Sequence, residues 1–176
     1  MSNPAINIPS MDIGPCNVKW NGTDLGGTLD NVVVNFKYMK ANIMADQTGE
    51  TVLDKAVSGV EVTVVTSIVQ TRDKDILALI FPNADVVTVG PQVYLQWNNK
   101  VAVRDLPQAQ QLVLHPLVED DAVTDYDWNF YKAMSNEESS VTIGPGEQYK
   151  LSITWQIFPD TSVQPYRFFR YGDLTI

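Results

Sequence analysis

The sequence contains one cysteine, Cys16, and one histidine, His115, among its 176 residues. A single cysteine excludes an internal disulfide and a cysteine-based zinc site, and a single histidine excludes a zinc site built on two histidines. A catalytic triad places a base between a nucleophile and a carboxylate, whereas His115 stands before a proline in an apolar stretch. We expect a structural role for His115. The sequence predicts no enzyme, no metal site and no cofactor.

Basic residues are scarce. Lysine and arginine number 12 against 21 acidic residues, so the formal net charge is -9. Because affinity for a phosphate backbone comes from lysine and arginine, nucleic-acid binding is not expected. Residues 1–10 show no basic stretch followed by an apolar one, and no apolar run approaches the ~18 residues of a membrane span. We expect neither a signal peptide nor membrane insertion, and a reducing compartment suits the lone cysteine.

No glycine-rich phosphate-binding loop is present. One acidic cluster comprises Glu119, Asp120, Asp121, Asp125 and Asp127. Carboxylates at such spacing can bind calcium or serve glycoside hydrolysis. The glycine and closing glutamate of an EF-hand loop are missing, however, and no second acidic cluster accompanies the first. We interpret the cluster as a solvated acidic loop.

Alternating apolar residues dominate the rest of the chain. Residues 31–44 and 60–71 each predict a long strand with one apolar face and one mixed, more polar face. This pattern is typical of a sheet with a core on one side and water on the other. Further strands are expected over residues 16–20, 86–89, 92–103, 111–118, 149–158 and 167–171.

Only residues 73–81 have helical spacing, with Thr71 or Asp73 as the cap and Pro82 at the end. Residues 1–12 predict an extended arm, and residues 13–176 a single domain. The expected fold class is mainly β, with two packed antiparallel sheets forming a sandwich or barrel. One short helix flanks the sheets, and a long extended hairpin joins the two long strands.

Three segments carry a resemblance to a known family. Residues 20–28 read WNGTDLGGT, residues 45–54 read ADQTGETVLD, and residues 77–82 add a short helix ending in proline. Together they resemble bacteriophage major tail tube proteins. The resemblance implies a β-sandwich subunit that forms hexameric rings, which stack into a hollow tube with a continuous inner barrel. Type VI secretion tube proteins and tail terminators share that fold.

The resemblance also implies roles for particular residues. The loop between the long strands would contact an adjacent ring or subunit; its residues are Asp46, Gln47, Thr48, Gly49, Glu50, Thr51, Val52 and Leu53. The polar faces of the two strands would line the channel, with Asn35, Glu61, Thr63 and Ser67 facing the lumen. The main partner would be further copies of the chain, with tape-measure, sheath, terminator and baseplate proteins as additional partners. DNA would pass through without specific binding, in a virion tail assembled in the host bacterial cytoplasm.

Two alternatives remain open at this point. Instead of a tube subunit, the chain would be a terminator or completion protein of the same fold. The other alternative is a monomeric β-sandwich module that binds a carbohydrate or receptor. Trp20, Trp97, Trp128 and Trp155 would be the stacking platforms of such a module. Trp97 and Trp155 lie within strand patterns, which predicts that they pack in the core.

Overall fold

The computed structural model describes residues 15–69, 72–135, 138–146 and 148–173. Over these residues the fold is mainly β, with a nine-stranded antiparallel sheet, a separate two-stranded sheet and one α-helix. The predicted fold class is therefore confirmed. The predicted N-terminal arm, residues 1–12, and the candidate cap Thr71 lie outside the described residues.

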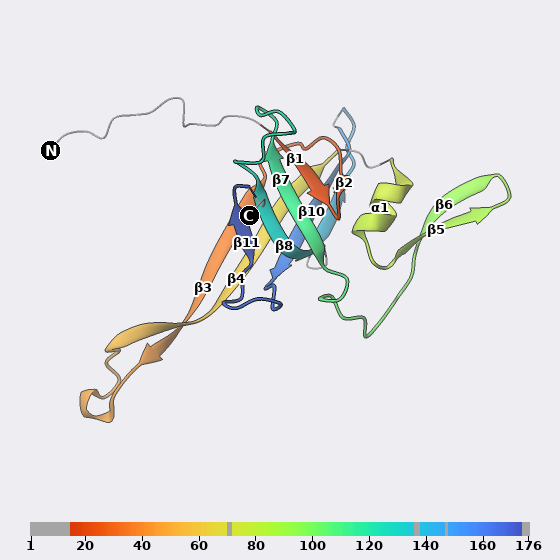
Figure 1. Ribbon diagram of the computed structural model, residues 1–176. Coiled ribbons are helices and arrows are strands. Elements are labelled where there is room, and N and C mark those ends of the chain that lie inside the picture. Colours follow the sequence, from red (N-terminus) through yellow and green to blue (C-terminus); the bar gives the residue numbers. More distant parts are fainter. Residues whose placement is uncertain (1–14, 70–71, 136–137, 147, 174–176) are drawn as a thin grey trace.

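The large sheet has the strand order β2-β1-β7-β8-β10-β4-β3, with β9 added beside β10 and β11 beside β8 (Figure 1). Its strands are β1 (Cys16–Trp20), β2 (Thr23–Asp24), β3 (Val33–Ile43), β4 (Asp54–Ile68), β7 (Gln110–Pro116), β8 (Trp128–Met134), β9 (Ser139–Thr142), β10 (Lys150–Phe158) and β11 (Phe169–Tyr171). Six of these strands correspond to predicted strands, and β2 returns from β1 after a turn at Asn21 and Gly22. The sequence pattern does not predict β8 and β9.

The sheet curves around one core. Strands β1 and β10 are not neighbours in the sheet, yet the rings of Trp20 and Trp155 lie 5.7 Å apart. Each indole also donates a hydrogen bond, from Trp20 Nε1 to the Ala133 carbonyl (3.1 Å) and from Trp155 Nε1 to Thr66 Oγ1 (2.9 Å). A buried polar group without a partner destabilises a fold, so these two bonds allow the indoles to fill the core.

Alternate residues of the two central strands supply that core. On β10 the buried side chains are Leu151, Ile153, Trp155 and Ile157, and on β4 they are Val62, Val64, Thr66 and Ile68. Burying one such apolar side chain contributes about 1.5–3 kcal/mol. The intervening residues point away from the core, as the period of two in the sequence predicts.

The hairpin of β3 and β4 extends well beyond the body of the protein (Figure 1). The two strands pair from Val33 and Val65 to Ile43 and Asp54, with a register shift between Met39 and Lys40. We call residues 40–57 the long arm. The prediction that β4 begins at Val60 was wrong, because the strand begins at Asp54 and pairs along the arm.

A second, shorter hairpin leaves the body on the side opposite β3 (Figure 1). Helix α1 (Lys74–Ile80) precedes it, and the Asp73 carboxylate accepts hydrogen bonds from the N–H groups of Asp75 and Ile76, as predicted for its cap. The hairpin consists of β5 (Ala84–Val89) and β6 (Gln92–Trp97), and we call residues 84–97 the short arm. The predicted strand over residues 92–103 was too long, because β6 ends at Trp97. No helix of the described residues is long and apolar enough to cross a membrane.

Candidate functional site

The tip of the long arm holds the loop that the resemblance singles out. A 3-10 turn spans Asp46–Thr48, and both the N–H and the hydroxyl of Thr48 bond the Ala45 carbonyl (2.9 and 2.8 Å). Gly49 follows with φ of 62°, a conformation that suits glycine. The Leu53 N–H then bonds the Ile43 carbonyl at 2.9 Å and closes the loop. All eight predicted loop residues are exposed, and the arm carries them away from the body.

The long arm and its base expose an unusual amount of apolar surface. Its large apolar side chains with more than a third of their surface accessible are Tyr38, Met39, Ile43, Met44, Val52, Leu53 and Val57. A two-stranded ribbon alone in water is marginally stable, and contiguous exposed apolar surface marks an interaction site. The arm is therefore a strong candidate for contact with another chain. Sequence patterning gives the strands but does not show that they leave the core.

The side of β3 and β4 that faces away from the core is mostly polar. Asn35 Nδ2 lies 3.5 Å from Thr63 Oγ1, and Lys37 Nζ forms a 3.0 Å ion pair with Glu61. By register, the same face continues onto β10 and β9, interrupted by Val33 and Val65. We call it the polar face; its polar members are Asn35, Lys37, Glu61, Thr63, Ser67, Ser140, Thr142, Lys150, Ser152, Thr154 and Gln156.

All four residues predicted to face a lumen lie on the polar face. Asn35 is exposed, and Glu61 and Thr63 are half-buried. Ser67 is 6% exposed, and its hydroxyl lies 3.0 Å from that of Ser152. Three of the four are therefore open to solvent, whereas Ser67 is enclosed by its neighbours. The facing of these residues toward a lumen stays a prediction.

The strands that carry the polar face end in two open edges. In the described part of the chain, β3 pairs with β4 alone and β9 pairs with β10 alone. The outer edge of β3 presents 11 residues. Unpaired N–H and C=O groups along such an edge are a template for pairing with a further strand.

The acidic cluster is only partly a solvated loop. Asp127 is 5% exposed, and its carboxylate lies 2.6 Å from Nδ1 of His115, which is 2% exposed. The prediction that Asp127 is solvated was therefore wrong, while Asp120, Asp121 and Asp125 are exposed. Within the described part of the chain, His115 Nε2 is buried without a hydrogen-bond partner, with Asp121 Oδ1 3.9 Å away. The described residues hold no group of three or more histidine, cysteine or acidic side chains able to bind a metal.

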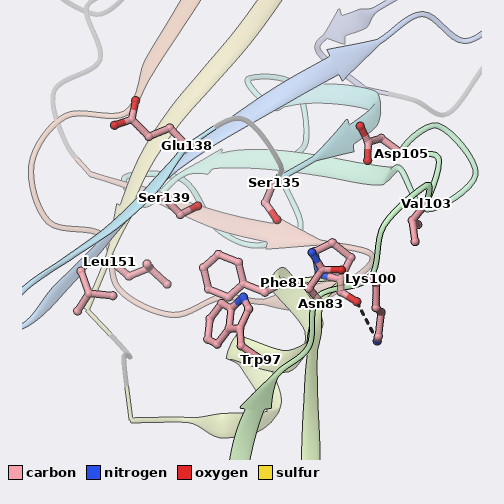
Figure 2. Close-up of a pocket in the computed structure, with 12 residues that line it drawn as sticks. Phe81, Asn83, Trp97, Lys100, Val103, Asp105, Ser135, Glu138, Ser139 and Leu151 are labelled. Carbon is pink, nitrogen blue, oxygen red and sulfur yellow. Dashed lines mark hydrogen bonds between the residues drawn. The ribbon is translucent and has the colours of Figure 1, made fainter.

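A cavity of about 540 Å³ lies where the short arm joins the body (Figure 2). The rings of Phe81 and Trp97 meet there with centroids 4.7 Å apart. Lys100 bonds the Pro82 carbonyl (3.2 Å) and the Asp85 carboxylate (3.1 Å). The hydrogen bond from Lys100, followed by that from Asn98, lowers the pKa of Asp85 below its ordinary value.

The tryptophans divide into two groups. Trp20 and Trp155 are 4% and 0% exposed, so the core position predicted for Trp155 is confirmed. Trp97 is 57% exposed, and the prediction that it packs in the core was wrong. The reason is that β6 belongs to a projecting ribbon rather than to the large sheet. Trp128 is half-buried in a cluster with Phe36, Phe169 and Tyr171.

Scans against models of known protein families and against curated protein sequences return no match to this chain. The assignment of a function therefore rests on the surfaces described above.

Proposed function

We propose that this chain is the structural subunit of a phage tail tube, which self-assembles into stacked hexameric rings around a channel for DNA. The observation that carries the proposal is the two-faced sheet β9-β10-β4-β3. It is apolar toward the core, mostly polar on the opposite side, and open at both edges. A sheet of this kind can close into a ring through identical copies, and closure removes its unpaired edges.

In this ring, the outer edge of β3 pairs with β9 of the next copy. The contact is head-to-tail. The ring therefore closes if a whole number of rotations from one copy to the next makes a full turn. Backbone N–H and C=O groups along both edges gain partners. The polar faces of all copies then line the channel.

The chemistry of the polar face suits a conduit for DNA. Its charges are Lys37, which is paired with Glu61, and Lys150, which is paired with Asp30, and its other polar members carry hydroxyl or amide groups. Strong binding to a phosphate backbone comes from lysine and arginine side chains that neutralise phosphates. A lining of paired charges, hydroxyls and amides stays wet and holds DNA weakly, which allows the duplex to slide.

The long arm supplies the contact between rings. Strands in a closed barrel tilt about 35–45° from its axis, so a ribbon that continues β3 and β4 leaves the ring at about this angle and advances toward the neighbouring ring. The exposed Val52 and Leu53 at its tip are then available to the neighbouring ring.

Sedimentation velocity and negative-stain microscopy of the purified chain test the proposal. We expect rings and tubes whose fraction rises with protein concentration. A chain that remains monomeric up to its solubility limit, also when tail-initiator proteins are added, would contradict the proposal.

A carbohydrate-binding module is the second candidate, and the exposed Trp97 beside Phe81 favours it. A ring face next to polar groups is a common platform for a sugar. A glycan array on the wild-type chain and on Trp97→Ala distinguishes the two functions. Clear hits that are lost in Trp97→Ala, from a chain that forms no rings, would replace the tube proposal.

A further inference from the structure

Beyond Asp85, the surface of the short arm carries no charge and is rich in apolar side chains. Residues 86–97 contain no acidic or basic side chain. Cross-strand pairing places Val86, Val93 and Trp97 on one face, and they are 38%, 43% and 57% exposed. The opposite face carries the polar Gln92 and Gln96 together with the exposed Val89 and Tyr94. Helix α1 packs against the strands, and these three side chains still remain open to solvent.

A groove of about 720 Å³ lies between the start of β3 and the strands β1, β7, β8 and β11. We call it the side groove. Its apolar lining includes Leu29, Val32, Val34, Val118, Tyr126 and Tyr171. Val118 is 62% exposed and Tyr171 is 52% exposed, so the groove is open to a partner.

The short arm and the side groove lie on the same side of the sheet. The cavity at the base of the arm is lined by Val141 of β9 and by Leu151, which points into the core from β10. The side groove is lined by Val34, which pairs with the core-facing Val64. Both features are therefore on the core side, one at the β9 edge and the other at the β3 edge, and neither is on the polar face.

Edge-to-edge pairing alone gives a small contact. Strand β9 has four residues, whereas a stable protein–protein interface buries roughly 800 Å² per partner. If β3 of one copy pairs with β9 of the next, the short arm of the second copy extends beyond the joint toward the side groove of the first. The short arm of one copy and the side groove of the other are apolar surfaces that can enlarge this contact.

We propose that the short arm of each copy docks through Val86, Val93 and Trp97 into the side groove of the adjacent copy. This inference rests on the proposed ring and specifies a second contact within it, outside the channel. The occupant of the groove is a second copy of this chain.

Two neighbouring positions on opposite faces of the short arm test the contact. Val93→Glu places a charge on the docking face, and Gln92→Glu places the same charge on the other face. In the groove, Val118→Glu is matched by Val101→Glu, because Val101 is also exposed but lies outside the groove. Circular dichroism and thermal unfolding verify that all four variants fold. Sedimentation velocity then gives the concentration at which half of each chain is assembled.

We expect Val93→Glu and Val118→Glu to raise this concentration about tenfold or more, since each buries an unpaired charge. Gln92→Glu and Val101→Glu should match the wild type. If wild type and all four variants assemble equally, the docking is wrong while the tube function stands. If Val93→Glu and Gln92→Glu weaken assembly equally, net charge rather than docking is responsible, and the inference is also refuted. A wild-type chain that forms no rings would instead refute the proposed function.

Discussion

Leu53 at the tip of the long arm offers a test of the contact between rings. Its side chain is 54% exposed in the isolated chain, and the proposed tube buries it against the next ring. Replacing Leu53 by serine removes apolar surface from the tip and leaves the core and the closing hydrogen bond from the Leu53 N–H unchanged. The folded subunit should therefore keep its free energy of unfolding to within about 0.5 kcal/mol.

The effect on stacking is much larger because every ring repeats the contact. Full burial of a leucine contributes about 1.5–3 kcal/mol, so burying the exposed half contributes roughly 1 kcal/mol per arm. Six arms in a hexameric ring together lose on the order of 6 kcal/mol, which corresponds to a roughly 10⁴-fold weaker association of two rings. Ring formation through β3 and β9 does not involve this side chain.

Tube lengths measured by negative-stain microscopy, together with sedimentation velocity, provide the assay. Leu53→Ser should yield single rings at concentrations where the wild type forms long tubes. Leu106→Ser is the matched control, because Leu106 is 46% exposed and lies in the loop between β6 and β7, away from the arm. Tubes of wild-type length from Leu53→Ser would refute the assignment of the long arm to ring stacking.

Three further predictions concern the core, the acid stability and the channel. Trp155→Phe should lower the free energy of unfolding, measured by urea denaturation, by about 2–4 kcal/mol. The substitution leaves a cavity and removes the hydrogen-bond partner of the buried Thr66 hydroxyl. A loss below about 0.5 kcal/mol would contradict the described packing of Trp155. Hydrogen bonds from the hydroxyl and then the N–H of Ser162, and after these from Arg167, lower the pKa of Asp160. The stabilising effect of the ionised Asp160 is therefore present above the ordinary aspartate pKa of about 3.9 and is lost as pH falls through the lower folded value. The melting temperature of Asp160→Asn should fall less steeply with decreasing pH than that of the wild type. Parallel curves of melting temperature against pH would refute this prediction. Lys37→Glu leaves Glu61 unpaired and adds acidic charge around the proposed channel. At low salt its tubes should be shorter than those of Lys37→Gln, and at high salt their length should recover because salt screens the repulsion. Tube lengths that do not depend on salt would place Lys37 outside the channel.

The sequence predicted those elements whose signals are local. The alternation along residues 16–20 and 149–158 gives β1 and β10, because one face of each strand packs in the core and the other does not. Asp73 and Pro82 likewise predict the two ends of α1, because helix capping and helix termination depend on neighbouring residues.

The missed features depend on contacts between distant segments. Strand β8 buries Asn129 next to Phe130 and Ala133 next to Met134, so its sequence lacks a clear period of two. Asp127 reads as one more solvated carboxylate until β7 brings His115 within 2.6 Å.

Local sequence patterns also do not predict that the two arms are exposed. Alternation in residues 84–97 predicts a hairpin, but it does not distinguish a hairpin within a sheet from one that projects into solvent. For this reason Trp97 was misassigned to the core. The loop at residues 46–53 was placed by resemblance, and the structure locates it at the tip of a projecting ribbon.

A cryo-EM reconstruction of the assembled wild-type chain tests the central claim most directly. We predict a closed ring in which β3 of each copy is hydrogen-bonded to β9 of the next, with Asn35, Glu61 and Thr63 facing the channel. A ring with β3 unpaired, or with Val62 and Val64 lining the channel, would contradict it.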